Sequence, residues 1–148
     1  MSETNLPLPE KFVELVEDGI GTVRDLLDEG DGEFAPLAVV GDTATNTVYP
    51  LQEDARRADE PIPEFVRRAA GKVDADFVFM LMYMPRDPAH ATETVGFVLE
   101  TYNGTWTSRV PVELSNGRKT VGEVRMHMMP GAQASVGLLP QPRGSASH

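Results

Sequence analysis

The side chains best suited to chemistry lie in the last third of the chain, around Arg125 and His127. Histidine changes charge near neutral pH and acts as a general acid or base, and an arginine beside it binds carboxylates or phosphates. In the strand pairing that the sequence predicts, these two side chains share one sheet face with an aromatic ring and two hydroxyls. The predicted ligand-binding set is Thr101, Trp106, Ser108, Arg125 and His127.

Two interpretations of this set are open. In the first, it forms a small polar pocket for a ligand or a cofactor-free reaction, to which Glu100 and Tyr102 also contribute. In the second, it is a half-exposed cross-strand cluster in which the tryptophan ring covers its neighbours. The sequence offers no nucleophile beside a base, no pair of acids and no catalytic motif of fixed spacing, so it assigns no catalytic residue.

Methionines form a second unusual feature. Three of them alternate in the segment DFVFMLMYMP (76–85), and three more lie in MHMMP (126–130). Methionine sulfur binds soft ions such as Cu(I), but methionine also fills irregular cores and adaptable binding surfaces. With strands in chain order, the two groups are three strands apart, roughly 14 Å at ~4.8 Å per strand. We therefore predict that Met80, Met82 and Met84 pack against the helices of the chain or against a second subunit.

The remaining metal candidate is His90 with Glu93, in a proline-containing loop. One histidine and one glutamate are too few ligands for a transition-metal site. The turns at 30–34 and 41–46 lack the alternating oxygen ligands of a calcium loop, and no phosphate-binding glycine motif occurs. The sequence predicts no metal and no cofactor.

The elements that would position these residues begin with two amphipathic helices. In residues 9–30, apolar side chains recur every three or four positions between a proline and a glycine. A second apolar stripe lies in residues 62–73. The segments 34–42 and 46–51 are expected to form two short strands between the helices.

Residues 76–85 are apolar at nearly every position. The short length of this segment, between charged and proline-containing sequences, favours a strand over a separate helix. Because both faces of this strand are apolar, we expect it inside the sheet with both faces covered.

The last third contains two Asn-Gly pairs, at 103–104 and 116–117. Asn-Gly between strand-like segments predicts tight hairpin turns. The strands joined by these turns are expected at about 95–102, 105–115 and 118–128.

The two turns fix a register in which Tyr102 lies opposite Thr105 and Ser115 lies opposite Arg118. Continuing this pairing along the last strand sets His127 directly opposite the Trp106 side chain.

The same register places Pro111 in one row with Gly96 and Gly122. Proline has no N–H to donate to a neighbouring strand. A proline with a glycine on each neighbouring strand therefore predicts a bulge or bend that crosses the sheet at this row.

Composition limits the classes of partner. The net charge is −10, and most acidic side chains lie before residue 88. Such a surface repels phosphate backbones and anionic lipid, so we expect no nucleic-acid and no membrane binding. The N-terminus lacks a signal-peptide pattern, no segment has the apolar length of a membrane span, and cysteine is absent. We expect a soluble cytoplasmic protein.

The 148-residue length suits a single domain. We predict a flexible arm at 1–8, one α+β domain at 9–138 and a disordered tail at 139–148. The domain is expected to have two layers, a mostly antiparallel sheet with two helices packed on one face, in the chain order α-β-β-α-β-β-β-β.

The predicted function follows from apolar side chains on both sheet faces, one of which is left for a second subunit. We predict a small non-catalytic binding or regulatory module that is a homodimer through a sheet face and that can bind a protein partner. The alternative is a cofactor-free enzyme or small-ligand binder with a pocket around Trp106, Arg125 and His127.

Overall fold

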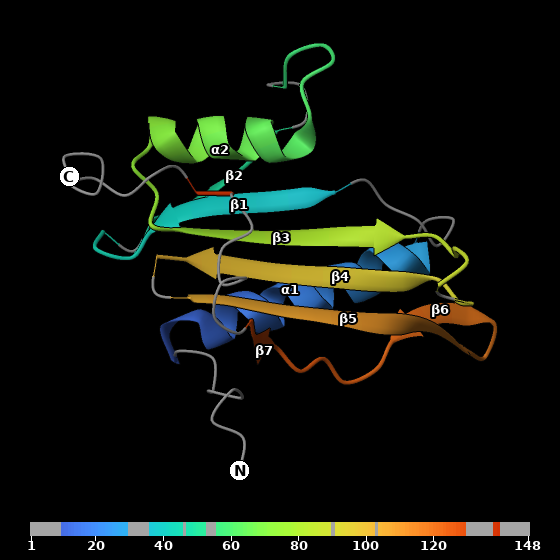
Figure 1. Ribbon diagram of the computed structural model, residues 1–148. Helices are drawn as coiled ribbons and strands as arrows, with labels where there is room; N and C mark the ends of the chain where they lie inside the picture. Colours follow the sequence, from blue (N-terminus) through green and yellow to red (C-terminus); the bar gives the residue numbers. More distant parts are fainter. Residues whose placement is uncertain are drawn as a thin grey trace.

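The computed structural model describes residues 10–29, 36–45, 47–52, 56–89, 91–102, 104–129 and 138–139. These residues form two helices and seven strands (Figure 1). In chain order they are α1 (Glu10–Glu29), β1 (Leu37–Asp42), β2 (Thr47–Pro50), α2 (Ile62–Lys72), β3 (Phe77–Met84), β4 (Thr94–Thr101), β5 (Gly104–Ser115), β6 (Arg118–Val121) and β7 (His127–Met128).

All strands belong to one antiparallel sheet with the order β2-β1-β3-β4-β5-β6, and β7 pairs with β5. The predicted α+β class and the chain order of its elements are confirmed. The structure has one strand more than expected, because β6 and β7 are separate where we predicted a single strand. β3 and β4 occupy the middle of the sheet.

β3 has a different helix on each face. Phe77, Phe79 and Leu81 pack in a core cluster with α1, whereas Val78 and Met80 pack in a second cluster with α2. Successive side chains of a strand point to opposite faces, so the two helices lie on opposite faces of the sheet. Figure 1 shows α1 behind the sheet. This differs from the expected arrangement with both helices on one face, and the physical reason is that a strand apolar on both sides needs cover on both.

α1 crosses its face of the sheet diagonally, from β3 to β6. Gly19 faces the sheet, and a Cβ at this position would lie 2.6 Å from Cε2 of Phe79, so glycine permits the close approach. Farther along, Arg24 donates to the carbonyl oxygens of Val121 and Gly122 at 3.2 and 3.0 Å. The buried stripe of the helix comprises Phe12, Val16, Gly19, Val23 and Leu27.

α2 is shorter, with 11 residues, and contacts β1 and β3. It begins after Pro61 and contains Pro63 in its first turn, where a proline removes no helical hydrogen bond. Its buried side chains are Phe65, Val66 and Ala70. The main contacts of α2 with the sheet are therefore on the part of the face formed by β1 and β3.

The second predicted hairpin is confirmed. Ser115 pairs with Arg118, as expected. The turn residues Asn116 and Gly117 have φ angles of 54° and 80°, the left-handed conformation that a type I′ turn requires.

The first hairpin has a register two residues from the predicted one, because Thr101 pairs with Gly104. Gly104 has a φ of 154°, which favours glycine, and the Thr101 hydroxyl donates to its carbonyl at 2.8 Å. A shift by two residues leaves each side chain on its predicted face. The predicted glycine row is wrong, however, since Pro111 pairs with Thr94 and not with Gly96.

Both outer strands of the sheet are poor templates for further strands. Leu51 donates its N–H inward to the carbonyl of Ala38 at 2.9 Å, so the neighbouring Pro50 has its nitrogen on the outward side, where it offers no N–H. At the other edge, β6 has only four residues and begins with Arg118 and Lys119. Short, charged or proline-containing edges resist edge-to-edge pairing.

The packing at Gly41 gives a test of the fold. A Cβ at Gly41 would overlap the ring of Phe77 and lie 2.7 Å from the carbonyl oxygen of Thr47. We expect Gly41→Ala to lower the free energy of unfolding by about 1–3 kcal/mol, measured by urea denaturation, because the core must move to admit the methyl group. The control is Gly21→Ala on α1, where nothing lies within 4 Å. It should raise stability by up to about 1 kcal/mol through helix propensity. Equal effects of the two substitutions would contradict the packing.

Candidate functional site

The predicted ligand-binding set is not assembled, because the last strand changes register. β6 ends at Val121, and the chain pairs again only at β7, where His127 lies opposite Thr107 and Met128 opposite Trp106. This pairing differs by one residue from the pairing of β6. A one-residue change turns side chains to the opposite face, so His127 points away from Trp106.

The members of the set have separate environments. Trp106 is 4% exposed and packs in the core cluster of α1. His127 is exposed, and the Arg125 side chain is 73% exposed in an ion pair with a neighbouring glutamate. Thr101 closes the first hairpin, and the half-buried Ser108 pairs with a core residue of β4. The expected geometry of a pocket shared by Trp106, Arg125 and His127 is therefore wrong.

The predicted absence of a metal site stays a prediction. His90 lies outside the described residues. Glu93 is engaged by protein groups: a hydrogen bond from the Tyr83 hydroxyl, and then one from Lys119 Nζ at 3.0 Å, lower the pKa of its carboxyl. Within the described segments, no group of three or more His, Asp or Glu side chains is placed to hold a metal ion.

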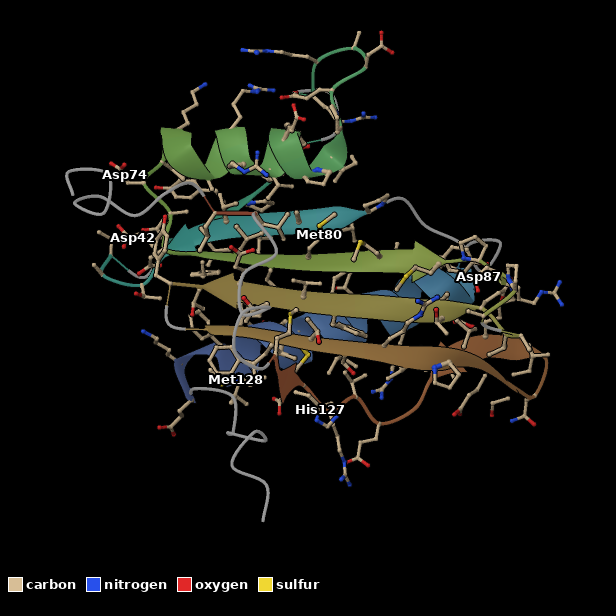
Figure 2. The ribbon with its side chains drawn as sticks, in the orientation of Figure 1. Asp42, Asp74, Met80, Asp87, His127 and Met128 are labelled. Carbon is tan, nitrogen blue, oxygen red and sulfur yellow. The ribbon has the colours of Figure 1, made fainter. Side chains whose placement is uncertain are left out.

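The three methionines of β3 lie on the α2 side of the sheet but in two environments. Met80 is 4% exposed and belongs to the core cluster of α2, so it packs inside the chain's own core. Met82 and Met84 are half-buried, farther along the strand. The terminal methyl of Met84 lies over Gly96, where a Cβ would overlap it, and that of Met82 lies 3.7 Å from the same position. The side-chain sticks of Figure 2 show β3 running from Met80 toward the end near Asp87.

We call this part of the α2 side the open sheet surface. Its residues come from β3, β4 and β5 and share one face by the strand register: Met82, Met84, Gly96, Val98, Thr107 and Arg109. Val98 and Thr107 are half-buried. At the margin, Arg109 donates to the Thr94 hydroxyl at 2.8 Å and lies 3.8 Å from Asp87. The surface is suited to apolar contact by adaptable side chains.

A buried carboxylate lies on the same face nearer to α2. Glu100 is 2% exposed, and its two oxygens accept the backbone N–H groups of Leu138 and Leu139 at 2.9 and 3.3 Å. Both leucines are buried in the core cluster of α2. Leu139, which we placed in a disordered tail, therefore belongs to the core, and the rest of the predicted tail lies outside the described residues. We call this arrangement the Glu100 site.

Tyr102 lies close enough to the Glu100 site to respond to its charge. Partial burial, followed by the negative charges of Glu100, Asp76 and Asp74, raises the pKa of the Tyr102 phenol. The phenol therefore stays protonated at neutral pH. Its acidic neighbours give this end of the sheet a negative charge.

A shallow hollow lies on the other face, between α1 and the β1–β2 edge. Its volume is about 260 Å³, and most of its lining is apolar, including Leu15, Leu37, Phe79 and Leu81. Leu37 is 38% exposed at its rim. None of the five predicted ligand-binding residues lines this hollow.

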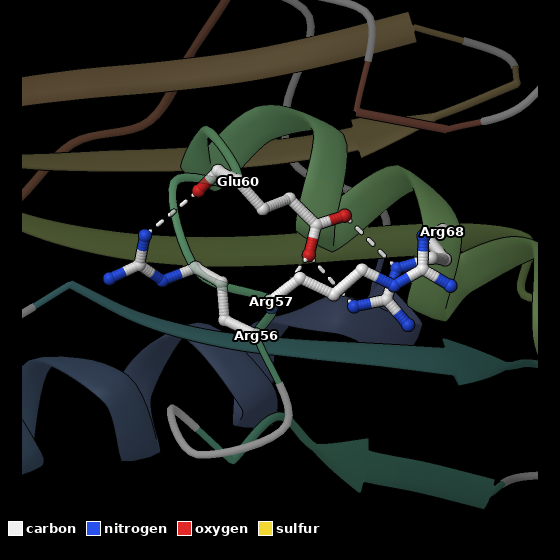
Figure 3. A network of polar contacts seen from close by, with 4 residues as sticks. All are labelled: Arg56, Arg57, Glu60 and Arg68. Atoms are coloured by element: carbon white, nitrogen blue, oxygen red, sulfur yellow. Dashed lines mark hydrogen bonds and ion pairs between the residues drawn. The ribbon is translucent and has the colours of Figure 1, made fainter.

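The loop before α2 is held by the polar network in Figure 3. Arg68 donates to both carboxylate oxygens of Glu60 at 3.0 and 2.8 Å, and the Arg57 N–H donates to one of them at 3.0 Å. Arg56 donates to the Glu60 carbonyl at 2.8 Å. The Arg68 hydrogen bonds, followed by that from Arg57, lower the pKa of Glu60 to about 2. The network fixes the loop that leads into α2.

Comparisons with known protein families, with curated proteins and with solved structures found no match to this chain. Neither helix among the described residues has the length and apolarity to cross a membrane. The functional argument therefore depends on the surfaces of the molecule itself.

The Glu60 network predicts a pH dependence. The pKa of Glu60 is lowered in the folded state from 4.5 to about 2, so its stabilising effect is complete above pH 4.5 and is lost as the pH falls toward 2. We expect Glu60→Gln to be less stable than the wild type near neutral pH, and the difference to shrink across this interval, measured by urea denaturation. Glu64→Gln, which removes an exposed charge from the first turn of α2, is the control. A difference between Glu60→Gln and the wild type that stays constant with pH would contradict the network.

Proposed function

We propose that this chain is a small non-catalytic binding or regulatory module that forms a homodimer through the open sheet surface. The observation that carries the proposal is the position of Met82 and Met84, half-buried beside Gly96 on the α2 side of the sheet. Methionine side chains adapt to an opposing surface and remain attractive to apolar groups when only partly covered. A sheet face that carries them beside its own helix is suited to a second subunit.

The sheet edges support association through a face. The outward nitrogen at Pro50 and the short, charged β6 both disfavour an added strand. A two-fold dimer uses the same patch on both subunits, so the patch must complement itself. The open sheet surface fits this requirement, because Met82 and Met84 place unbranched, flexible side chains beside Gly96.

The charge at this surface is also compatible with self-association. The chain carries a net charge of −10, which opposes self-association in general. At the margin of the open sheet surface, Arg109 lies near Asp87. Two copies can therefore meet here with an arginine and an aspartate on each side, rather than with acidic side chains alone. The chain has no cysteine, which suits the reducing cytoplasm that we propose as its location.

The homodimer is tested by sedimentation velocity over a micromolar concentration range. We expect the wild type to dimerise reversibly, and Met84→Glu to weaken the dimer by at least about tenfold, since it places a charge on each copy of the interface. The control is Leu114→Glu, which makes the same change of charge at a side chain that is 74% exposed on β5, facing the α1 side. It should leave the dimer constant unchanged.

Two results would contradict the proposal. A wild type that sediments as a monomer throughout this range would remove the homodimer. A dimer weakened equally by Met84→Glu and Leu114→Glu would show that general charge, and not the open sheet surface, controls association.

A further inference from the structure

The Glu100 site has the chemistry of a peptide-binding site. Its carboxylate is 2% exposed, and a buried carboxylate must receive hydrogen bonds to remain charged. In this structure it receives them from two consecutive backbone N–H groups, those of Leu138 and Leu139. Such contacts recognise a peptide backbone, which every sequence without proline offers.

The apolar part of the site adds a preference for side chains. Leu138 and Leu139 are 4% and 7% exposed, in the cluster that contains Val66 and Ala70 of α2 and Val78 of β3. Figure 1 shows the pair beside α2, on the side of the sheet opposite α1. The site therefore combines a backbone-binding carboxylate with room for two adjacent large aliphatic side chains.

The leucine pair packs against the sheet but forms no strand of it. Neither Leu138 nor Leu139 belongs to a strand of the sheet, so removing the pair breaks no strand pairing. The cluster that holds it also includes the partly buried Met82 and Val98 of the open sheet surface. A segment that replaced the pair would thus extend naturally onto that surface.

We infer that the Glu100 site is an exchangeable peptide-binding site, which the chain's own Leu138–Leu139 occupies and which also accepts an extended segment with two adjacent leucines from a partner protein. The occupant's leucine nitrogens must carry hydrogens, and its charge is best neutral or basic, given the acidic chain. The carboxylate of Glu100 and the leucine pair lie outside the open sheet surface, although the leucines share its apolar cluster. The inference is measured by peptide binding, so its failure and that of the homodimer are distinguishable.

The test uses a fluorescein-labelled peptide with the sequence SVGLLPQP, residues 135–142, and full-length protein. In the variant Leu138→Ser/Leu139→Ser, the attached segment competes poorly, so we expect this variant to bind the peptide at least about tenfold more tightly than the wild type, measured by anisotropy. Adding Glu100→Gln to the variant should weaken binding by at least about tenfold. A peptide N-methylated at both leucines keeps the side chains but lacks the two N–H donors, and should not bind.

A second measurement applies to the unmodified chain. If the pair is exchangeable, its amide hydrogens exchange through a local opening, about 100-fold or more faster than those of Phe79 and Phe97 in the central strands. Exchange of the Leu138 and Leu139 amides only with global unfolding would overturn the inference, and this holds even if the serine variant fails to fold. Equal binding of the normal and N-methylated peptides, or no binding to the folded serine variant, would overturn it as well.

Discussion

The structure depends on the need to keep β3 away from water on both faces. On one face β3 carries aromatic and aliphatic side chains, and on the other it carries Val78 and Met80. A single layer of helices would leave one of these apolar faces exposed to water. The chain meets this need with helices of unequal length. α1, with 20 residues, crosses its face as far as β6, whereas α2, with 11 residues, has its main contacts with β1 and β3. The opening on the α2 side follows from this inequality.

The α2 side therefore contains three neighbouring regions with different cover. The helix covers the first, the Leu138–Leu139 pair covers the second at Glu100, and the third is the open sheet surface around Met82 and Met84. The first two contain buried core side chains, and we propose that the second and third also bind partners. Because all three share apolar side chains of one cluster, a partner at the Glu100 site and a second subunit on the open sheet surface would meet each other. The proposed module thus binds through one face of the sheet, while the opposite face is occupied by α1.

Sequence patterns predicted the fold well where one physical signal dominated. The helices, the central β3 and the Asn116-Gly117 turn are examples, since helical periodicity, two-sided apolarity and turn chemistry are local properties. The His127 pocket failed because we continued one strand register past Gly122. Beyond Gly122, polar Glu123, Arg125 and His127 alternate with apolar residues. This alternation indicated the other register, because a shift of one residue turns the apolar side chains toward the core. The Glu100 site was missed for another reason: its leucines lie in a Pro- and Gly-rich segment, and only the tertiary structure brings them to a carboxylate of β4.

The central claim is that Met80 is inside the chain's own core while Met82 and Met84 form part of a surface that a second copy covers. The most direct measurement is solution NMR of the methionine methyl groups, with a soluble nitroxide added at low and at high protein concentration. The account predicts that the Met80 signal is protected from the nitroxide at both concentrations. The Met82 and Met84 signals should broaden at low concentration and become protected at high concentration. A Met80 signal that broadens, or Met82 and Met84 signals whose broadening does not depend on concentration, would contradict it.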